Sequence, residues 1–332
     1  MSTSAMRDQT IQAYRWQKLG QVFDPRKASK RPWMSEFAQA PATLVLEDRV
    51  RVFFSCRPPA DLDGQYVSRA AWVDLDRRDL TQVVALAEEP ILSLGEKGAF
   101  DEFGTYPLSV VQSAGEIVAY YAGWTRCRSV PFNTAIGMAR SRDGGHHFTK
   151  LGRGPVLGFT LEEPFVISGP KIRYWDGVWY LFYIAGRKWK LDNGRAEPVY
   201  KIRMAASSDG IRWSRSNRDL VESLLEDDEA QASPDVFRGR SGYHMFYCYR
   251  HSIGYKSAGR GYRIGYAYSS DLVTWVRDDK RAGLVASEAG WDSESVSYPH
   301  VFEVDGVIYM LYLGNHVGRW GFGLARLHGS FD

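Results

Sequence analysis

A proline that recurs about every 64 residues is the feature that most constrains the fold of this 332-residue chain. The spacings between successive copies are 66, 63, 64 and 65 residues, and the copies are Pro41, Pro107, Pro170, Pro234 and Pro299. Each proline opens a short apolar segment. Since a proline at the first residue of a strand removes no ladder hydrogen bond, we expect a β-strand to begin there.

Each repeat then continues in the same way. A polar turn follows, such as Asp-Gly at 176–177 or Ala-Gly at 114–115, and leads to a second strand rich in aromatic residues. Asp-Gly between two apolar runs is a hairpin signal. A third strand follows, and in three repeats it runs into a Ser-x-Asp turn before an aromatic residue that starts a fourth strand: Phe148, Trp213 and Trp275.

The repeats therefore predict an all-β fold, a five-bladed β-propeller with four antiparallel strands in each blade. The fifth repeat lacks a fourth strand, and residues 14–20, with Trp16 in the aromatic position, are expected to close the ring. We expect a flexible N-terminus at 1–13 and a single domain at 14–330, with blades starting near residues 41, 107, 170, 234 and 299. A sandwich of two stacked sheets is the alternative, but it does not explain the even five-fold spacing.

Composition limits the class of protein. A net charge of +3 is too small to argue for nucleic acid, and no apolar run is long enough to span a membrane, so a soluble cytoplasmic protein is expected. The three cysteines have no metal-ligand spacing, and Cys56 and Cys248 are expected to be buried free thiols. No metal site and no cofactor are predicted, and the oligomeric state is left open.

In a propeller, the loops that lead into the first strand of each blade and those that leave its second strand open on the same face, where ligands bind. Each leading loop here carries an acid shortly before the proline: Glu36, Asp101, Glu163, Asp228 and Asp292. Solvated loop acids are the alternative for any one of them. Asp235 directly follows its proline and is expected to face the channel or to cap the strand.

The exit loops, which leave the second strands, carry bases: Arg57, Arg126, Arg187, Arg250 and His316. If these cations converge, they suit an anionic substrate, since arginine makes bidentate bonds to carboxylate and phosphate groups. Cations that only promote solubility are the alternative. Two exit loops, 186–200 and 251–262, are long, and we expect them to wall the cavity.

Two segments, 298–312 and 202–213, resemble the five-bladed propeller glycosidases of glycoside hydrolase families 43, 32 and 130, and the resemblance extends over about residues 14–327. It implies two catalytic carboxylates on the inner strands and their leading loops. Three family-43 positions depart from that pattern: Ala40, Leu108 and Ser168 stand where acids are typical. The invertase Arg-Asp-Pro triplet is absent, and Asp24-Pro25 is a partial match.

The leading hypothesis is a carbohydrate-active enzyme that cleaves a glycosidic bond in the central cavity with two carboxylates. The candidates are first Asp101, Glu163 and Asp292, then Asp228 and Glu36. The expected substrate contacts are Tyr106, Tyr298, His300, Asp235 and the exit-loop cations. A phosphorylase or sugar-nucleotide transferase that uses those cations, and a catalytically silent glycan-binding propeller, are the alternatives. The expected ligand is a carbohydrate or a sugar phosphate.

Overall fold

The computed structural model describes residues 13–113 and 115–331 and consists of five four-stranded antiparallel sheets. The first blade contains β2 (Glu36–Val45), β3 (Arg49–Arg57), β4 (Arg69–Asp76) and β5 (Val83–Leu86). The second contains β6 (Thr105–Ser113), β7 (Glu116–Arg126), β8 (Phe132–Ser141) and β9 (Thr149–Lys150). The third contains β10 (Phe165–Trp175), β11 (Val178–Asp192), β12 (Arg195–Ser207) and β13 (Ser214–Arg215).

The fourth blade contains β14 (Glu229–Arg238), β15 (Tyr243–His251), β16 (Arg263–Ser269) and β17 (Val276–Arg277). The fifth contains β18 (Ser297–Val304), β19 (Val307–Leu313), β20 (Phe322–His328) and β1 (Arg15–Phe23). The inner strands β2, β6, β10, β14 and β18 contact one another in this order, and β18 contacts β2 again. The predicted five-bladed propeller is therefore confirmed.

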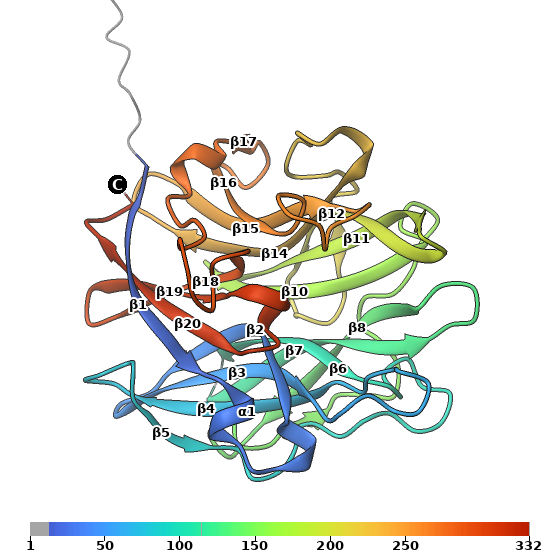
Figure 1. The fold of residues 1–332 in the computed structure, drawn as a ribbon, viewed down its shortest axis with the longest axis horizontal. Coiled ribbons are helices and arrows are strands. Elements are labelled where there is room, and N and C mark those ends of the chain that lie inside the picture. Colours follow the sequence, from blue (N-terminus) through green and yellow to red (C-terminus); the bar gives the residue numbers. More distant parts are fainter. Residues whose placement is uncertain (1–12, 114, 332) are drawn as a thin grey trace, which may run out of the picture.

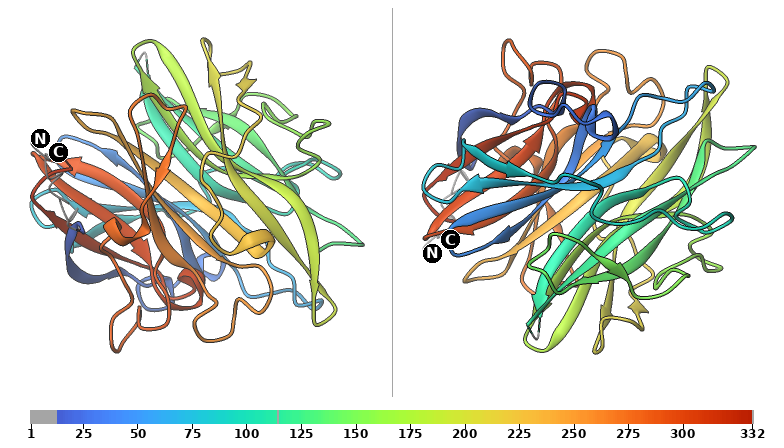
Figure 2. Two further views of the ribbon diagram at one scale, coloured as in Figure 1. Left: turned by 90° about the horizontal axis from the view of Figure 1, so that it is seen from above. Right: turned by 90° about the horizontal axis from the view of Figure 1, so that it is seen from below.

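The N-terminal strand closes the ring, as predicted. β1 pairs antiparallel with β20, from Arg15 opposite His328 to Phe23 opposite Phe322. Figure 1 and Figure 2 show this blue first strand beside the red last strand in every view. Trp16 secures it, because its indole Nε1 donates to the carbonyl of Ala282 at 2.9 Å. Of the N-terminal segment predicted to be flexible, residues 1–12 lie outside the described residues, as does Ala114 of a predicted turn.

The repeated prolines lie inside the inner strands and not at their first residues, which corrects the sequence-based expectation. Each inner strand begins two to five residues earlier, and each proline sits at a register shift. A bulge leaves this position without a ladder partner, so the missing N–H of proline costs nothing. The residue before the proline has a positive φ in four blades: Ala40, Gly169, Ser233 and Tyr298. For the three that are not glycine, this backbone costs roughly 1–2 kcal/mol each.

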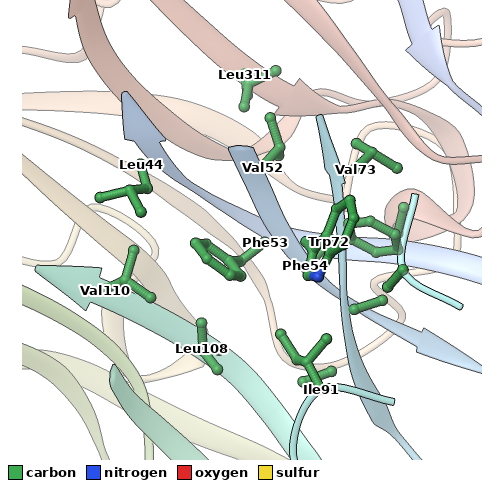
Figure 3. Close-up of a cluster of buried hydrophobic side chains, with 14 of the residues drawn as sticks. Leu44, Val52, Phe53, Phe54, Trp72, Val73, Ile91, Leu108, Val110 and Leu311 are labelled. Atoms are coloured by element: carbon green, nitrogen blue, oxygen red, sulfur yellow. The ribbon is translucent and has the colours of Figure 1, made fainter. Parts of the chain in front are cut away.

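The core lies between the blades. Val52 and Phe53 of the first blade share one apolar cluster with Leu108 and Val110 of the second and with Leu311 of the fifth (Figure 3). Burying each such side chain contributes roughly 1.5–3 kcal/mol. This packing fixes the inner strands against one another and therefore fixes the ends at which their loops meet.

One predicted loop is a strand pair. Residues 186–200 continue β11 and β12 as a two-stranded ribbon that pairs as far as Asp192 opposite Arg195, whereas 251–262 is a loop with turns, as expected. Among the described residues, helix is limited to α1 (Pro25–Ala28) and short 3-10 segments at Pro32–Met34, Glu226–Asp228, Asp279–Arg281 and Asn315–Gly318. No helix in residues 13–113 and 115–331 is long and apolar enough to cross a membrane.

Candidate functional site

The face of the ring at which the inner strands begin is called the amino face, and the recurring acids lie near it. In the second blade Asp101 is 1% exposed and accepts a hydrogen bond from the Tyr121 hydroxyl at 2.9 Å. Its carboxylate also pairs with Lys150 of the outer strand β9 at 2.5 Å. This group of three, named here the carboxylate latch, ties a leading loop to the second and the fourth strand of its blade.

The fifth blade repeats the latch with Asp292, which contacts the Tyr312 hydroxyl at 3.1 Å and Lys18 of β1 at 2.6 Å. In the third blade, Glu163 accepts from the Tyr183 hydroxyl at 2.8 Å. Glu163 also pairs with two arginines, Arg203 at 2.7 Å and Arg215 of β13.

The fourth blade builds its latch from other acids. Asp279, which follows the outer strand, accepts from the Tyr247 hydroxyl at 2.8 Å and pairs with Arg277 of β17, and Arg277 also pairs with Glu229. The predicted acid of this blade, Asp228, instead contacts His251 and Arg260, each at 3.1 Å.

The first blade replaces the charged latch by apolar packing. Phe54 stands in the position of the latch tyrosine, and Leu86 stands in the position of the outer-strand cation. Its predicted acid, Glu36, pairs with Arg319 at 2.7 Å and accepts from the Tyr66 hydroxyl at 3.2 Å. Acids thus recur in the leading loops of the second, third and fifth blades, where they form the same contact with a tyrosine and with a cation of the outer strand.

A second buried polar network crosses the channel between inner strands. Asp235 is fully buried, and its carboxylate contacts Arg173 at 2.9 Å and His300 Nδ1 at 3.1 Å. His300 Nε2 accepts the backbone N–H of Thr43 at 3.0 Å, which places the imidazole proton on Nδ1, facing Asp235. Lys171 lies 3.4 Å from the same carboxylate. Burial alone would raise the pKa of Asp235, but Arg173, His300 and Lys171 hold it well below the usual range.

The residues before two of the prolines meet over the channel. The Tyr106 hydroxyl of the second blade donates to the Tyr298 hydroxyl of the fifth blade at 3.1 Å, although the first blade separates their strands in the ring. Burial raises the pKa of Tyr106 to about 12. The ring of Tyr262, from the fourth blade, contacts Tyr298 edge-on at 5.8 Å, and its hydroxyl lies 2.5 Å from that of Tyr200 in the third blade.

Two arginines flank these tyrosines. The Arg250 guanidinium lies 4.0 Å from the ring of Tyr255 and 5.4 Å from that of Tyr262. On the other side, the Arg57 guanidinium lies 5.3 Å from the ring of Tyr66 and 5.7 Å from that of Tyr106. All five blades contribute to this group, which we name the tyrosine–arginine cluster: Arg57, Tyr66, Tyr106, Tyr200, Arg250, Tyr255, Tyr262 and Tyr298.

A row of partly buried aromatic rings extends outward from the cluster over the second and third blades. Trp124 lies 6.0 Å from Tyr106 and 4.2 Å from Phe132, and Phe132 lies 5.6 Å from Trp189. These rings are named here the aromatic row. Trp189 belongs to the ribbon of β11 and β12 that extends beyond the blade.

The structure brings four predicted binding residues into the cluster: Arg57, Tyr106, Arg250 and Tyr298. It places Asp235 and His300 together in the channel network. The other cations lie apart, because Arg126 pairs with Asp61 and Arg187 pairs with Asp219, each at 2.8 Å, whereas the exposed His316 stacks edge-on against Trp320. The catalytic role assigned to the leading-loop acids stays a prediction.

Sequence reasoning did not include four tyrosines of the cluster among the site residues, Tyr66, Tyr200, Tyr255 and Tyr262, and it missed one acid. Tyr200 and Tyr262 each stand two residues before the isoleucine of a third strand, in Tyr-Lys-Ile and Tyr-Arg-Ile, and this shared position could have found them. Glu197 is 6% exposed and lies 3.8 Å from Arg250. Burial raises the pKa of its carboxyl above the ordinary value, against the opposing effect of Arg250.

The other end of the channel carries a cavity of about 300 Å³, lined in part by Arg173, Trp175, Arg238 and His300. Both arginines there are paired with acids, Arg173 with Asp235 and Arg238 with Asp176. Within residues 13–113 and 115–331, no group of three or more His, Cys, Asp and Glu side chains is arranged to hold a metal ion.

Two curated proteins of Mycobacterium tuberculosis are similar along nearly the whole chain. "Uncharacterized protein MT1551", from strain CDC 1551 / Oshkosh, and "Uncharacterized protein Rv1502", from strain H37Rv, are each 33% identical over 313 residues. The match covers 94% of this chain and 99% of each relative. No family model matches the sequence.

Solved structures share the fold at lower identity. A structure described as "Glycoside hydrolase" superposes with a TM-score of 0.72 at 17% identity and covers 94% of this chain and 92% of its own. A thermostable family-43 glycoside hydrolase gives a TM-score of 0.65 at 16% identity, and the match covers 89% of this chain and 90% of that chain. A family-130 structure superposes with a TM-score of 0.65 at 14% identity, and the match covers 98% of this chain and 96% of that chain. Its description names glycoside hydrolases that target β-1,2 mannosidic linkages. This likeness shows the fold.

Proposed function

We propose that this protein binds a carbohydrate at the amino face. The chain belongs to the same protein family as the two mycobacterial proteins, and it has the fold of the glycoside hydrolase propellers, which supports the proposal. The sugar would lie against the aromatic row and reach the tyrosine–arginine cluster. The observation that carries this proposal is the convergence of hydroxyl, guanidinium and aromatic groups from all five blades at one place.

The chemistry of these groups suits a sugar. A pyranose ring presents a face of C–H groups that packs on an aromatic ring, and hydroxyls at its edge that need donors and acceptors. Trp124, Phe132 and Trp189 are only partly buried and offer such ring faces. Phenol hydroxyls both donate and accept, as sugar hydroxyls require.

A glycan array followed by calorimetry tests the proposal. We expect the protein to bind at least one oligosaccharide, and we expect Trp124→Ala and Trp189→Ala each to weaken that binding about tenfold or more, since a buried aromatic contact is worth about 1.5 kcal/mol or more. Trp175→Ala is the matched control, because Trp175 packs on Tyr180 and Tyr243 at the opposite end of the channel. If no oligosaccharide binds, or if both variants bind as the wild type does, the proposal is wrong.

Cleavage of a glycosidic bond is the second candidate function, and Glu197 favours it. A general acid needs a carboxyl with a raised pKa, and burial raises the pKa of Glu197, against the opposing effect of its ion pairs with Arg250 at 3.8 Å and Arg195 at 3.2 Å. Glu36, at the other side of the cluster, contacts Tyr66 and would be the second carboxylate. Asp101, Glu163 and Asp292 remain candidates, although each is already held by a tyrosine and at least one cation.

The bound oligosaccharide decides between binding and cleavage. Samples incubated with and without phosphate should be analysed for products, because phosphate-dependent products indicate phosphorolysis and phosphate-independent products indicate hydrolysis. If the bond is cleaved through Glu197, Glu197→Gln should abolish product formation while sugar binding persists. An intact ligand after long incubation supports the binding function alone.

A further inference from the structure

We propose that the ligand of the tyrosine–arginine cluster carries an oxyanion, either a carboxylate or a phosphate, and that Arg57 binds this group. The inference rests on the proposed carbohydrate-binding function and names its substrate class, an acidic sugar.

The three other predicted exit-loop arginines lie near a carboxylate, and the exposed histidine contacts an aromatic ring. Arg126 and Arg187 form ion pairs at 2.8 Å with acids of neighbouring loops. Arg250 lies 3.8 Å from Glu197, and His316 packs against Trp320. Arg57 is the one predicted exit-loop arginine with which no carboxylate in the part of the chain that the structure describes forms an ion pair.

The Arg57 guanidinium is nevertheless held in place. Its Nη2 donates to Oε1 of Gln39 at 2.9 Å, and its carbon lies 4.4 Å from the ring of Phe37 and 5.3 Å from that of Tyr66. Its Nε is buried and has no hydrogen-bond partner among the described residues. Burial lowers the pKa of Arg57, which is the expected effect of removing a cation from water without supplying an anion.

An oxyanion would relieve this desolvation. A planar guanidinium donates two parallel N–H bonds to a carboxylate or a phosphate, and charge-assisted bonds of this kind are roughly twice as strong as neutral ones. Gln39 and the two rings hold the guanidinium in one orientation, so little side-chain entropy is lost when the anion binds.

Three buried hydroxyls belong to strands that carry residues of the tyrosine–arginine cluster. Ser55 lies two residues before Arg57 on β3 and is 1% exposed, and Thr105 and Ser297, both 0% exposed, directly precede Tyr106 and Tyr298. None of these three hydroxyls has a hydrogen-bond partner in residues 13–113 and 115–331. Since buried polar groups normally have partners, a polar ligand that reached these hydroxyls would satisfy them.

Calorimetry with matched sugars tests the proposal. The probes are a galacturonic acid trisaccharide, its methyl ester, the corresponding neutral galactose trisaccharide, glucose 1-phosphate and inorganic phosphate. We expect an acidic probe to bind about tenfold or more tightly than its neutral counterpart, since a hydrogen bond to a charged group is worth about 1.5–3 kcal/mol. Preference for the trisaccharide acid identifies a carboxylate, and preference for glucose 1-phosphate identifies a phosphate.

Variants distinguish a specific contact between Arg57 and the anion from general electrostatic attraction. Arg57→Gln should abolish the preference for the acidic probe, and Arg57→Lys should restore only part of it, since lysine lacks the planar fork. Arg142→Gln is the matched control, because Arg142 lies in the turn after β8, is exposed and pairs with Glu116 of β7. Thermal unfolding should show that Arg57→Gln still folds cooperatively, since the substitution removes the contacts with Gln39 and the two rings but breaks no ion pair among the described residues.

The outcomes that contradict the inference are distinct from failure of carbohydrate binding. Equal affinity for acidic and neutral probes overturns the anion proposal and leaves the proposed function intact. Equal loss of affinity for all probes in Arg57→Gln also overturns it. If the wild type binds none of the oligosaccharide probes and none on the glycan array, both proposals are wrong.

Discussion

Replacing Glu163 by glutamine separates a structural role from a catalytic one. The side chain of Glu163 is 0% exposed, and those of its partners Arg203 and Arg215 are 2% and 13% exposed. Removing one partner of a buried ion pair typically costs about 3–5 kcal/mol, because the remaining charge stays buried without compensation. Arg203 retains Asp219 at 3.1 Å, so we expect the lower end, about 3 kcal/mol.

The expected change in melting temperature follows from chain length. An unfolding entropy of about 2.1 cal/mol/K for each of 332 residues gives about 0.7 kcal/mol/K, so a loss of about 3 kcal/mol lowers Tm by about 4 °C. Differential scanning calorimetry measures this shift. Glu162→Gln is the matched control, since the neighbouring Glu162 is exposed and should leave Tm unchanged.

A double-mutant cycle strengthens the test. If the latch operates, adding Arg215→Gln to Glu163→Gln should cost less than the sum of the two single changes, by about 1 kcal/mol or more. The reasoning is refuted if Glu163→Gln leaves Tm within about 1 °C of the wild type and abolishes turnover of a bound glycan, since Glu163 would then be a catalytic residue and not a latch.

Two further predictions concern buried groups. Burial lowers the pKa of His300 to about 4, below the unfolded value of about 6.5, so the unfolded state binds the proton more readily. The contribution of His300 to the free energy of unfolding should therefore be complete above pH 6.5, and the free energy should fall by about 3 kcal/mol as the pH drops to about 4. In urea unfolding, His300→Gln should lose this pH-dependent fall, and a variant of the exposed His328 should keep it. An unchanged pH profile in His300→Gln would contradict the prediction. Iodoacetamide should label only the exposed Cys127 in the native protein, because Cys56 and Cys248 are buried and burial raises their thiol pKa values; mass spectrometry that finds either buried cysteine modified before unfolding would contradict this.

The fold could be predicted because its signal is periodic. Five prolines at nearly even spacing, each followed by a turn and an aromatic strand, leave few architectures to choose from, and Trp16 indicated the strand that closes the ring. The exact place of the prolines could not be predicted, because a bulge inside a strand and the start of a strand both spare a hydrogen bond. The ribbon at 186–200 was missed because its charged residues are typical of a loop.

The site was harder to predict because recurrence has two causes. Asp101, Glu163 and Asp292 recur at similar positions, and a repeated catalytic loop and a repeated structural contact give the same pattern in one sequence. The distinction lies in partners that are distant in the chain. Asp292 pairs with Lys18, which is 274 residues away, and only ring closure brings the two together.

The charge of the amino face now follows from these pairings. Asp101, Glu163 and Asp292 are each opposed by a lysine or an arginine of the outer strand, so they add little negative potential at the channel mouth. Arg57 has no such opposing charge among the described residues, and the tyrosines beside it are neutral at physiological pH, since the pKa of a tyrosine is ordinarily about 10 and burial raises those of Tyr106 and Tyr298 further. A ligand that approaches the tyrosine–arginine cluster therefore meets an uncompensated cation among neutral hydroxyls, and this combination favours an acidic sugar over a neutral one.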